Sequence, residues 1–226
     1  MRIVTWNCYK GYPNERFARL SALKPDICIL QECAKPLEPL GNNVCWFGDN
    51  PRKGVAVLAG PNHRLTPWPL DQRVEHSTYP VVLTTPDGKT IHILAVWSKP
   101  KPTYVSAIAH GLNAYRDFLR AAPSIVVGDF NSHSRWDKKG AEWTHSRLVE
   151  HLRHEFGLVS AVHSKYPSEP EPPTIYFQWK EDRPYHIDYC FVPEAWTGRI
   201  STVEVGSYLD FQGESDHRPV MVEIAD

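Results

Sequence analysis

The chain has 226 residues, of which 42% are hydrophobic, and a formal net charge of −1 from 25 basic and 26 acidic side chains. This composition excludes an intrinsically disordered chain, and the near-neutral charge excludes nucleic-acid binding that depends on the field of the whole molecule. A local basic patch is not excluded. The length fits a single domain over residues 1–226, because mixed cores of about 200–250 residues commonly fold as one unit.

The cysteines indicate neither a disulfide framework nor a zinc site, because their number is odd and no CxxC pair occurs. Most lie in apolar runs, so we expect them to be buried: Cys8, Cys28, Cys33, Cys45 and Cys190. Met1-Arg2-Ile3 leads straight into a strand pattern without a signal peptide's apolar segment, and no apolar run approaches the ~20 residues of a membrane span. We therefore expect a cytoplasmic protein without membrane association, and no protein partner is predicted.

Short apolar, β-branched runs predict the strands. In chain order the expected strands span residues 2–8, 26–30, 44–47, 54–58, 79–85, 90–97, 124–130, 174–178, 185–192, 200–208 and 220–224. The turn Pro86-Asp87-Gly88-Lys89 predicts a hairpin between two of them. The strand over 90–97 is apolar on both faces, so both of its faces must be covered.

Three helices are expected. Asn14 should cap the first, over 15–23, and Pro25 stops it. The second spans 103–121, where apolar side chains recur at spacings of three and four, and the third spans 142–156. Hairpins mixed with strand–helix–strand units predict mixed sheets, and doubly buried strands with few helices predict two sheets packed face to face. The expected fold is therefore of the α/β class, a four-layer α/β/β/α sandwich with outer helices.

Polar residues stand where several of these strands end. Gly128-Asp129-Phe130-Asn131 follows a buried apolar run, and α/β proteins bind ligands just outside such strand ends. Taken alone, this stretch is equally typical of an Asp/Asn turn. The same kinds of residue end or interrupt other expected strands, however: Trp6-Asn7, Gln31-Glu32, Ile187-Asp188-Tyr189 and Ser215-Asp216-His217.

These five motifs, in this order, resemble those of the endonuclease/exonuclease/phosphatase superfamily, the group that contains deoxyribonuclease I and exonuclease III. The resemblance runs from Trp6-Asn7 to Ser215-Asp216-His217-Arg218-Pro219-Val220, which is nearly the whole chain. Each motif is weak alone, but five of them in the family's order are a specific signal. The resemblance implies the same sandwich fold.

Hydrolysis of a phosphodiester needs a hard cation on a phosphate oxygen, an activated water and stabilisation of the charge in the transition state. The resemblance implies Glu32 as the principal Mg²⁺ ligand, supported by Asn7 and Asp216, and Mn²⁺ is an expected substitute. Magnesium takes oxygen ligands and keeps several waters, so one or two carboxylates suffice. For a single Glu at a strand end, a solvated charge is the simpler interpretation.

Asp129 is the candidate for orienting or deprotonating the attacking water, and Asn131 for donating its amide to the phosphate. His217 is expected to contact the scissile phosphate, while Asp188 accepts a hydrogen bond from its other ring nitrogen. That pairing favours a protonated ring facing the anion. A buried structural acid is the commoner explanation of Asp188 considered alone, and the pair with His217 favours catalysis.

One strand end departs from the family's pattern. Many phosphodiesterases of the superfamily carry a His where Ala95-Val96-Trp97 ends, and the exonuclease III branch has a Tyr near this point. An indole only donates a hydrogen bond and cannot be a general acid. Lys99, Lys101 and Tyr104 follow closely and are alternative proton donors to the leaving oxygen, as is a water on the cation. An aromatic ring that simply packs against the strand end is an equally good interpretation of Trp97.

The loop after Asn131 is expected to meet the substrate. A tryptophan among basic residues fits base stacking combined with phosphate contact: Arg135, Trp136, Lys138 and Lys139. An ordinary solvated loop is the alternative. Three further basic residues near strand ends extend this patch: Lys10, Arg52 and Lys53. Four histidines lack a partner at metal-binding spacing and are expected at the surface: His145, His151, His154 and His163.

The sequence therefore predicts a magnesium-dependent hydrolase of phosphodiester bonds, a nuclease with nucleic acid as the leading substrate class. A phosphatase or phosphodiesterase acting on a small or lipid phosphoester is the second hypothesis. The third is a binding protein that kept the fold and lost catalysis, and the complete set of polar strand-end residues argues against it.

Overall fold

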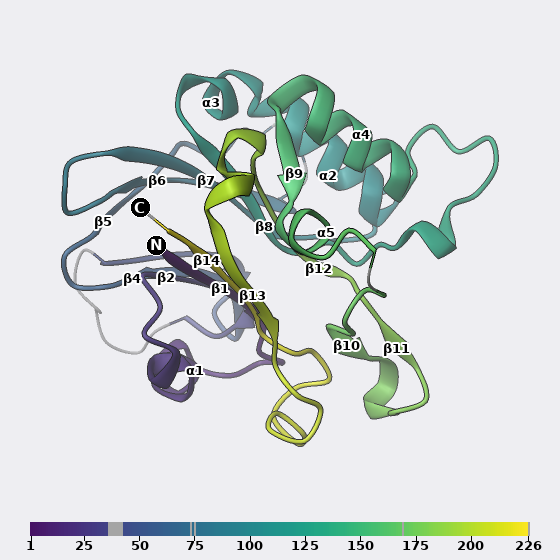
Figure 1. Cartoon of the computed structure of the whole chain (residues 1–226), viewed down its shortest axis with the longest axis horizontal. Helices are drawn as coiled ribbons and strands as arrows, with labels where there is room; N and C mark the ends of the chain where they lie inside the picture. The colour runs from purple at the N-terminus through teal and green to yellow at the C-terminus, as the bar shows by residue number, and fades with distance from the viewer. Residues whose placement is uncertain (36–42, 73, 75, 169, 226) are drawn as a thin grey trace.

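Two β-sheets pack face to face in the structure, a computed structural model that describes residues 1–35, 43–72, 74, 76–168 and 170–225 (Figure 1). The first sheet has the order β13 (Ile200–Val205), β14 (Val220–Ile224), β1 (Arg2–Asn7), β2 (Ile27–Cys33), β4 (Lys53–Ala59) and β3 (Val44–Asn50). The second has the order β5 (Arg64–Pro67), β6 (Thr78–Thr84), β7 (Thr90–Trp97), β8 (Ser124–Asp129), β12 (Asp188–Pro193) and β9 (Leu158–Ser160). A small ribbon joins β10 (Ile175–Tyr176) to β11 (Pro184–Tyr185).

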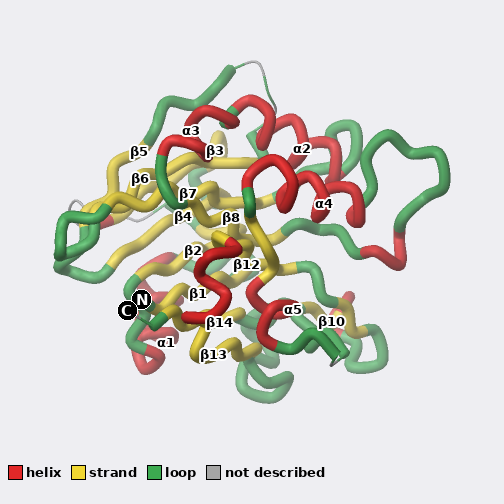
Figure 2. The backbone as a smooth tube through the Cα atoms, turned by 45° about the horizontal axis from the view of Figure 1, so that its top comes forward, coloured by secondary structure: helices red, strands yellow, loops and turns green. Residues whose placement is uncertain are grey.

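Helices lie outside the sheets, which confirms the expected α/β/β/α sandwich (Figures 1 and 2). The outer face of the second sheet is covered by α2 (Tyr104–Ala114), α3 (Arg116–Ala121) and α4 (His145–Phe156). The outer face of the first sheet is covered by α1 (Pro13–Leu20), and α5 (Ala161–Lys165) packs against β12 and β13. Within the described ranges, no helix is long and apolar enough to cross a membrane.

The core between the sheets is built from alternate residues of the central strands. Ile29 and Val57 of the first sheet and Ile93 and Val127 of the second are fully buried in one cluster. The intervening residues of the same strands face outward and are buried under the helices, as Val126 is. Each sheet is therefore apolar on both faces, and this requires helices on the outside. All five cysteines are free and buried, as expected.

Strand direction brings the polar strand ends together. In the first sheet β1 runs parallel to β2, so that Asn7 lies beside Gln31. In the second sheet β7 runs parallel to β8, with Trp97 beside Asp129, and β12 runs antiparallel to β8, with Asp188 on the other side of Asp129. Parallel neighbours end at the same edge of a sheet. The stacking of the two sheets then gathers these ends into one region.

Several expected boundaries of helices are wrong. Helix α1 begins at Pro13 with Tyr12 as its N-cap residue, so Asn14 is not the cap; a proline fits the first helical position because its φ is already helical there. The helix expected over 103–121 breaks at Tyr115, a buried residue whose hydroxyl accepts a hydrogen bond from the backbone N–H of Asp71. Helix α4 begins at His145 rather than at residue 142, because Thr144 caps it.

Some expected strands are shorter than predicted, and two were missed. The strand expected over 174–178 is only β10, because Gln178 and Trp179 have positive φ angles of 58° and 62°, which end the extended conformation. The strand expected over 200–208 ends at Val205. The strand expected over 185–192 is divided between β11 and β12. Strands β5 and β9 have only four and three residues, too few for an alternating pattern to be recognised.

Gly128 offers a test of the close approach between β7 and β8. Its φ is +144°, and a Cβ atom at this position would lie 2.0 Å from the carbonyl oxygen of Val96. We expect Gly128→Ala to lower the free energy of unfolding by at least about 3 kcal/mol, because the strands must separate beside Asp129. Thermal unfolding should show a midpoint roughly 6–12 °C below that of the parent.

Gly88→Ala is the matched control, because Gly88 also has a positive φ, +81°, but no atom within 4 Å of the added Cβ. Only conformational strain of about 1–2 kcal/mol is expected there. Equal losses in the two variants would show that the contact with Val96 is not the cause.

Candidate active site

Asn7 connects the two sheets at the edge where the polar strand ends meet. Its amide Nδ2 donates to Asp129 Oδ2 at 3.0 Å and lies 3.4 Å from Glu32 Oε1. Asn7 is the last residue of β1, Asp129 the last of β8, and Glu32 lies near the end of β2. Three of the predicted site residues, from two sheets, are therefore joined by one side chain.

Asp129 is a buried carboxylate that accepts hydrogen bonds from several N–H groups. Its side chain accepts from Asn7 Nδ2, from Asn131 Nδ2 at 2.9 Å and from the backbone N–H of Asn131 at 2.9 Å. Asn131 has a φ of 47°, a conformation that folds its amide back towards Asp129. Burial raises the pKa of Asp129 to about 7, against the lowering effects of His217 and the amide donors. A carboxyl with such a pKa is suited to accepting a proton near neutral pH.

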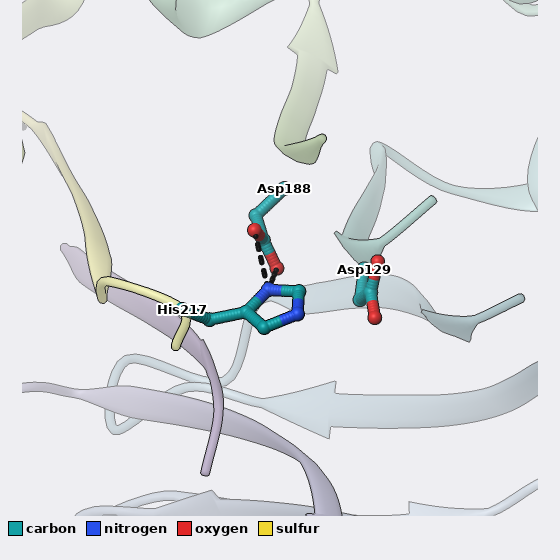
Figure 3. A group of neighbouring side chains, drawn as sticks. All are labelled: Asp129, Asp188 and His217. Carbon is teal, nitrogen blue, oxygen red and sulfur yellow. Dashed lines mark hydrogen bonds and ion pairs between the residues drawn. The ribbon is translucent and has the colours of Figure 1, made fainter. Parts of the chain in front are cut away.

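His217 lies between two carboxylates. Figure 3 shows its imidazole between Asp188 and Asp129, with Nδ1 2.9 Å from Asp188 Oδ2 and 3.2 Å from Asp188 Oδ1. Burial disfavours the protonated ring, but the charges of Asp188 and Asp129 outweigh it and raise the pKa of His217 to about 10. The ring is therefore a buried cation at neutral pH and suits contact with an anion.

Residues to which the sequence assigned no role hold this group in position. Thr174 Oγ1 accepts from the backbone N–H groups of Ile187 at 2.9 Å and Asp188 at 3.0 Å. Ser215 Oγ donates to the carbonyl of Asn7 at 2.6 Å and accepts from the N–H of His217 at 3.0 Å. Ser215 was part of a recognised motif, whereas nothing in the sequence around Thr174 marked it out.

Arg218 supports the same turn from within the core. It is 1% exposed, and its Nη1 donates to the carbonyls of Ser215 at 2.7 Å and His217 at 2.8 Å. Its guanidinium lies 5.0 Å from the ring centroids of both Tyr176 and Tyr208. Its place directly after His217 in the motif was the available signal, but burial of an arginine is not foreseeable from one sequence.

The predicted metal ligands Glu32 and Asp216 face the same region. Glu32 has a φ of 55° at a shift in the pairing of β2 with β4, and its side chain remains 18% exposed. Burial raises the pKa of Asp216, and the charge of Glu32 raises it further, against the effect of His217. The carboxylates of Glu32 and Asp216 are close enough for their charges to interact, and Glu32 lies beside the amide of Asn7. Together they offer the oxygen atoms that a hard divalent cation takes. These residues fit such a cation.

The predicted substrate residues separate into three sets. Tyr104, Trp136 and Lys138 line a pocket of about 240 Å³ together with Asn131, and Trp143 adds a ring that the sequence did not single out. Trp97 is buried beside Asp129, with the ammonium groups of Lys53 and Lys99 at 5.0 Å and 4.8 Å from its ring centroid. Arg135 and Lys139 are exposed and are not among the residues that line the pocket.

The prediction that His145 lies at the surface is wrong. His145 is 6% exposed at the first turn of α4, where its Nδ1 lies 2.9 Å from Ser132 Oγ. Burial lowers its pKa to about 4, so the ring is neutral. Of the other three histidines, His154 and His163 are exposed as expected and His151 is half-buried. His145 supports the loop that follows Asn131 from the helical side.

A family model described as the Endonuclease/Exonuclease/phosphatase family matches residues 4–217. The chain belongs to this family. Members of the family are hydrolases that act on phosphoester bonds and depend on a divalent metal ion. In this chain, Asp129, Asp188 and His217 form a buried cluster of acidic and histidine side chains. One potential metal-ligand atom from each of the three lies within 4.8 Å of the other two.

Solved structures of the family superpose on the whole chain. A 3'-5' exonuclease (NExo) from Neisseria meningitidis is 19% identical with a TM-score of 0.73, and 100% of each chain is covered. An AP endonuclease from Archaeoglobus fulgidus is 16% identical with a TM-score of 0.68, and 99% of each chain is covered. The human Nocturnin catalytic domain is 17% identical with a TM-score of 0.65, covering 98% of this chain and 93% of that one. At these identities the likeness shows the fold. Among curated proteins no sequence matches this one significantly.

The interaction of Asp188 with His217 predicts a change in titration that is measurable without metal. In the metal-free protein, NMR of the imidazole nitrogens should show His217 protonated up to about pH 10. Asp188→Asn removes the largest charge that raises this pKa, so the transition should move to lower pH. Asp117→Asn, at an exposed carboxylate on α3, should leave it in place.

The same interaction has a defined effect on stability. The folded pKa lies above the ordinary value of 6.5, so the stabilisation is complete below pH 6.5 and is lost as the pH rises through about 10. The stability difference between the parent and Asp188→Asn should shrink over that range. A constant difference would contradict a charge interaction.

Proposed function

We propose that this protein is a magnesium-dependent hydrolase of phosphodiester bonds in nucleic acid. The observation that carries the proposal is the arrangement of Asp129 between the amides of Asn7 and Asn131 and the cationic ring of His217. The buried carboxyl has a pKa of about 7, and the buried imidazole one of about 10. Between pH 7 and pH 10, Asp129 is therefore an ionised base while His217, in the same small group, is still a cation. Hydrolysis of a phosphodiester requires both.

Each residue has a defined part in the reaction. A divalent cation held by Glu32, Asp216 and Asn7 would supply Lewis-acid polarisation of a phosphoryl oxygen. Asp129 orients the attacking water and accepts its proton. His217 donates from Nε2 to a non-bridging oxygen, while its Nδ1 stays bonded to Asp188. Asn131 keeps Asp129 in place and borders the aromatic pocket.

The pocket beside Asn131 supports nucleic acid as the substrate class. Tyr104 and Trp136 are 38% and 46% exposed although both are large and aromatic, and Lys138 contributes a positive charge to the same wall. Aromatic rings beside a basic group suit a nucleobase and its phosphate. A related structure, a 3' phosphatase NExo from Neisseria bound to a product DNA hairpin, is 20% identical with a TM-score of 0.73. It supports the same class of substrate.

Asp129→Asn tests the catalytic assignment. Loss of the base should lower kcat by about 10²–10⁴ on an oligonucleotide and on a small aryl phosphodiester alike. The assay should compare single-stranded, duplex and abasic DNA, RNA and simple phosphomonoesters, each with magnesium and with chelator. The parent should cleave a nucleic acid only when magnesium is present.

Asp117→Asn, an exposed carboxylate on α3, is the control for loss of a charge. Thermal midpoints near that of the parent would assign the loss to chemistry. A decrease of less than threefold for Asp129→Asn would refute its role. If only phosphomonoesters are hydrolysed, the protein is a phosphatase and the proposed nuclease activity is wrong.

Trp136→Ala tests the pocket. If a base stacks there, oligonucleotide binding should weaken by about 1–3 kcal/mol, while hydrolysis of a small aryl phosphodiester should stay nearly unchanged. Trp68→Ala is the matched control, since Trp68 is equally exposed at 45% and also packs on aromatic rings, those of His92 and Phe118, but is not among the residues that line the pocket. Equal effects of Trp136→Ala on both substrates would mean that the pocket takes no base.

A further inference from the structure

Lys53 is a basic residue that contacts a proposed metal ligand. It begins β4, opposite the shifted pairing at Glu32, and its Nζ lies 3.0 Å from Glu32 Oε2. The two side chains are 36% and 18% exposed, so solvent only partly screens the pair. The same Nζ lies 5.0 Å from the ring centroid of Trp97, which is the neighbour of Asp129 in the second sheet.

The ammonium group and a divalent cation need the same carboxylate. A hard cation bound to Glu32 takes oxygen lone pairs that Lys53 now uses, and two cations at one oxygen repel each other. Departure of Nζ from Oε2 removes this repulsion and frees the oxygen, so it favours binding of the metal. The lysine is long enough to move while its stem stays on β4, and the face of Trp97 provides a neutral surface that attracts a cation.

A displaced Lys53 would remain beside the reacting group. Trp97 pairs with Asp129, and a second ammonium, that of Lys99, lies 4.8 Å from the same ring. The indole of Trp97 at this strand end carries no charge of its own. An ammonium on the face of Trp97 would supply positive charge where a phosphate oxygen is expected.

We propose that Lys53 occupies Glu32 in place of the metal and, once the metal displaces it, contributes its charge to the bound phosphodiester. This rests on the proposed function, because it assumes that Glu32 binds the cation. The exchange keeps the charge of Glu32 neutralised before the metal arrives. It also lowers the affinity for the metal, since the cation must compete with Lys53.

The sign of the change in metal affinity separates this role from a structural one. If Lys53 competes with the metal, Lys53→Met should bind Mn²⁺ about 1.5-fold to fivefold more tightly than the parent, the range expected for a partly exposed ion pair. If Lys53 only orients Glu32, its removal should weaken binding. Lys53→Arg retains a cation and should restore an affinity close to that of the parent.

The experiment is a calorimetric titration of substrate-free protein with Mn²⁺ alone. Lys35→Met is the matched control, because Lys35 Nζ also lies over a tryptophan ring, 5.9 Å from the centroid of Trp46, but no contact with Glu32 is seen within the described residues. Its affinity for Mn²⁺ should equal that of the parent. A second measurement takes KM for bis(4-nitrophenyl) phosphate at saturating Mn²⁺, which should rise about threefold to tenfold in Lys53→Met and recover in Lys53→Arg.

The outcomes are distinct. Unchanged or weaker Mn²⁺ binding by Lys53→Met overturns the competition, and tighter binding with an unchanged KM overturns the contact with the phosphate. If Lys35→Met binds Mn²⁺ more tightly by the same factor, the effect comes from the net charge of the protein, and this result also overturns the proposal. If the parent binds no Mn²⁺, or Glu32→Gln binds it as well as the parent does, the proposed metal site itself is wrong and this inference falls with it.

Discussion

The hydrogen bond from Asn7 to Asp129 joins the last residues of two strands that belong to different sheets. A distance of 3.0 Å between two short side chains leaves little tolerance in the spacing of those sheets. That spacing is set by the interdigitated core between them, in which residues such as Ile29 and Val127 are fully buried. Cores of this kind are close-packed and resist deformation. The geometry of the site is therefore a consequence of how tightly the two sheets pack.

The second constraint is electrostatic. Asp188 is fully buried, Asp129 nearly so, and each isolated charge would be costly in such surroundings. The cationic ring of His217 compensates both carboxylates, and the amides of Asn7 and Asn131 satisfy the remaining lone pairs of Asp129. This balance explains why a basic pKa and a near-neutral carboxyl pKa occur within one group. The acid–base properties of the group therefore follow from the interactions that compensate these buried charges.

The periphery of the site is less constrained and more specific to this chain. Glu32 leaves the regular strand through a positive φ and meets Lys53, whose ammonium also lies over the ring of Trp97. On the other side, Tyr104 and Trp136 stay exposed at the pocket beside Asn131. The buried centre thus supports a reaction common to the family. In the proposed function, the partly exposed rim selects the substrate.

Much of this arrangement was predictable from local sequence. Apolar runs that end in Asn7, Gln31-Glu32 and Asp129 indicated both the strands and the polar edge, because strand periodicity and strand termination are local properties. The motif order indicated the family. Helix boundaries were less predictable: at the break, the hydroxyl of Tyr115 accepts a hydrogen bond from Asp71, which lies 44 residues away and which no local pattern indicates.

The sequence by itself determined which side chains can accept protons or donate hydrogen bonds, since a carboxylate or an imidazole keeps its donors and acceptors in any fold. Only the tertiary structure decided how those residues behave. The pKa values of Asp129 and His217 depend on burial and on each other's charge, which come from segments far apart in the chain. The buried Arg218 and the pairing of Lys53 with Glu32 were decided in the same way. Burial and proximity are properties of packing, and packing exists only once the two sheets have met.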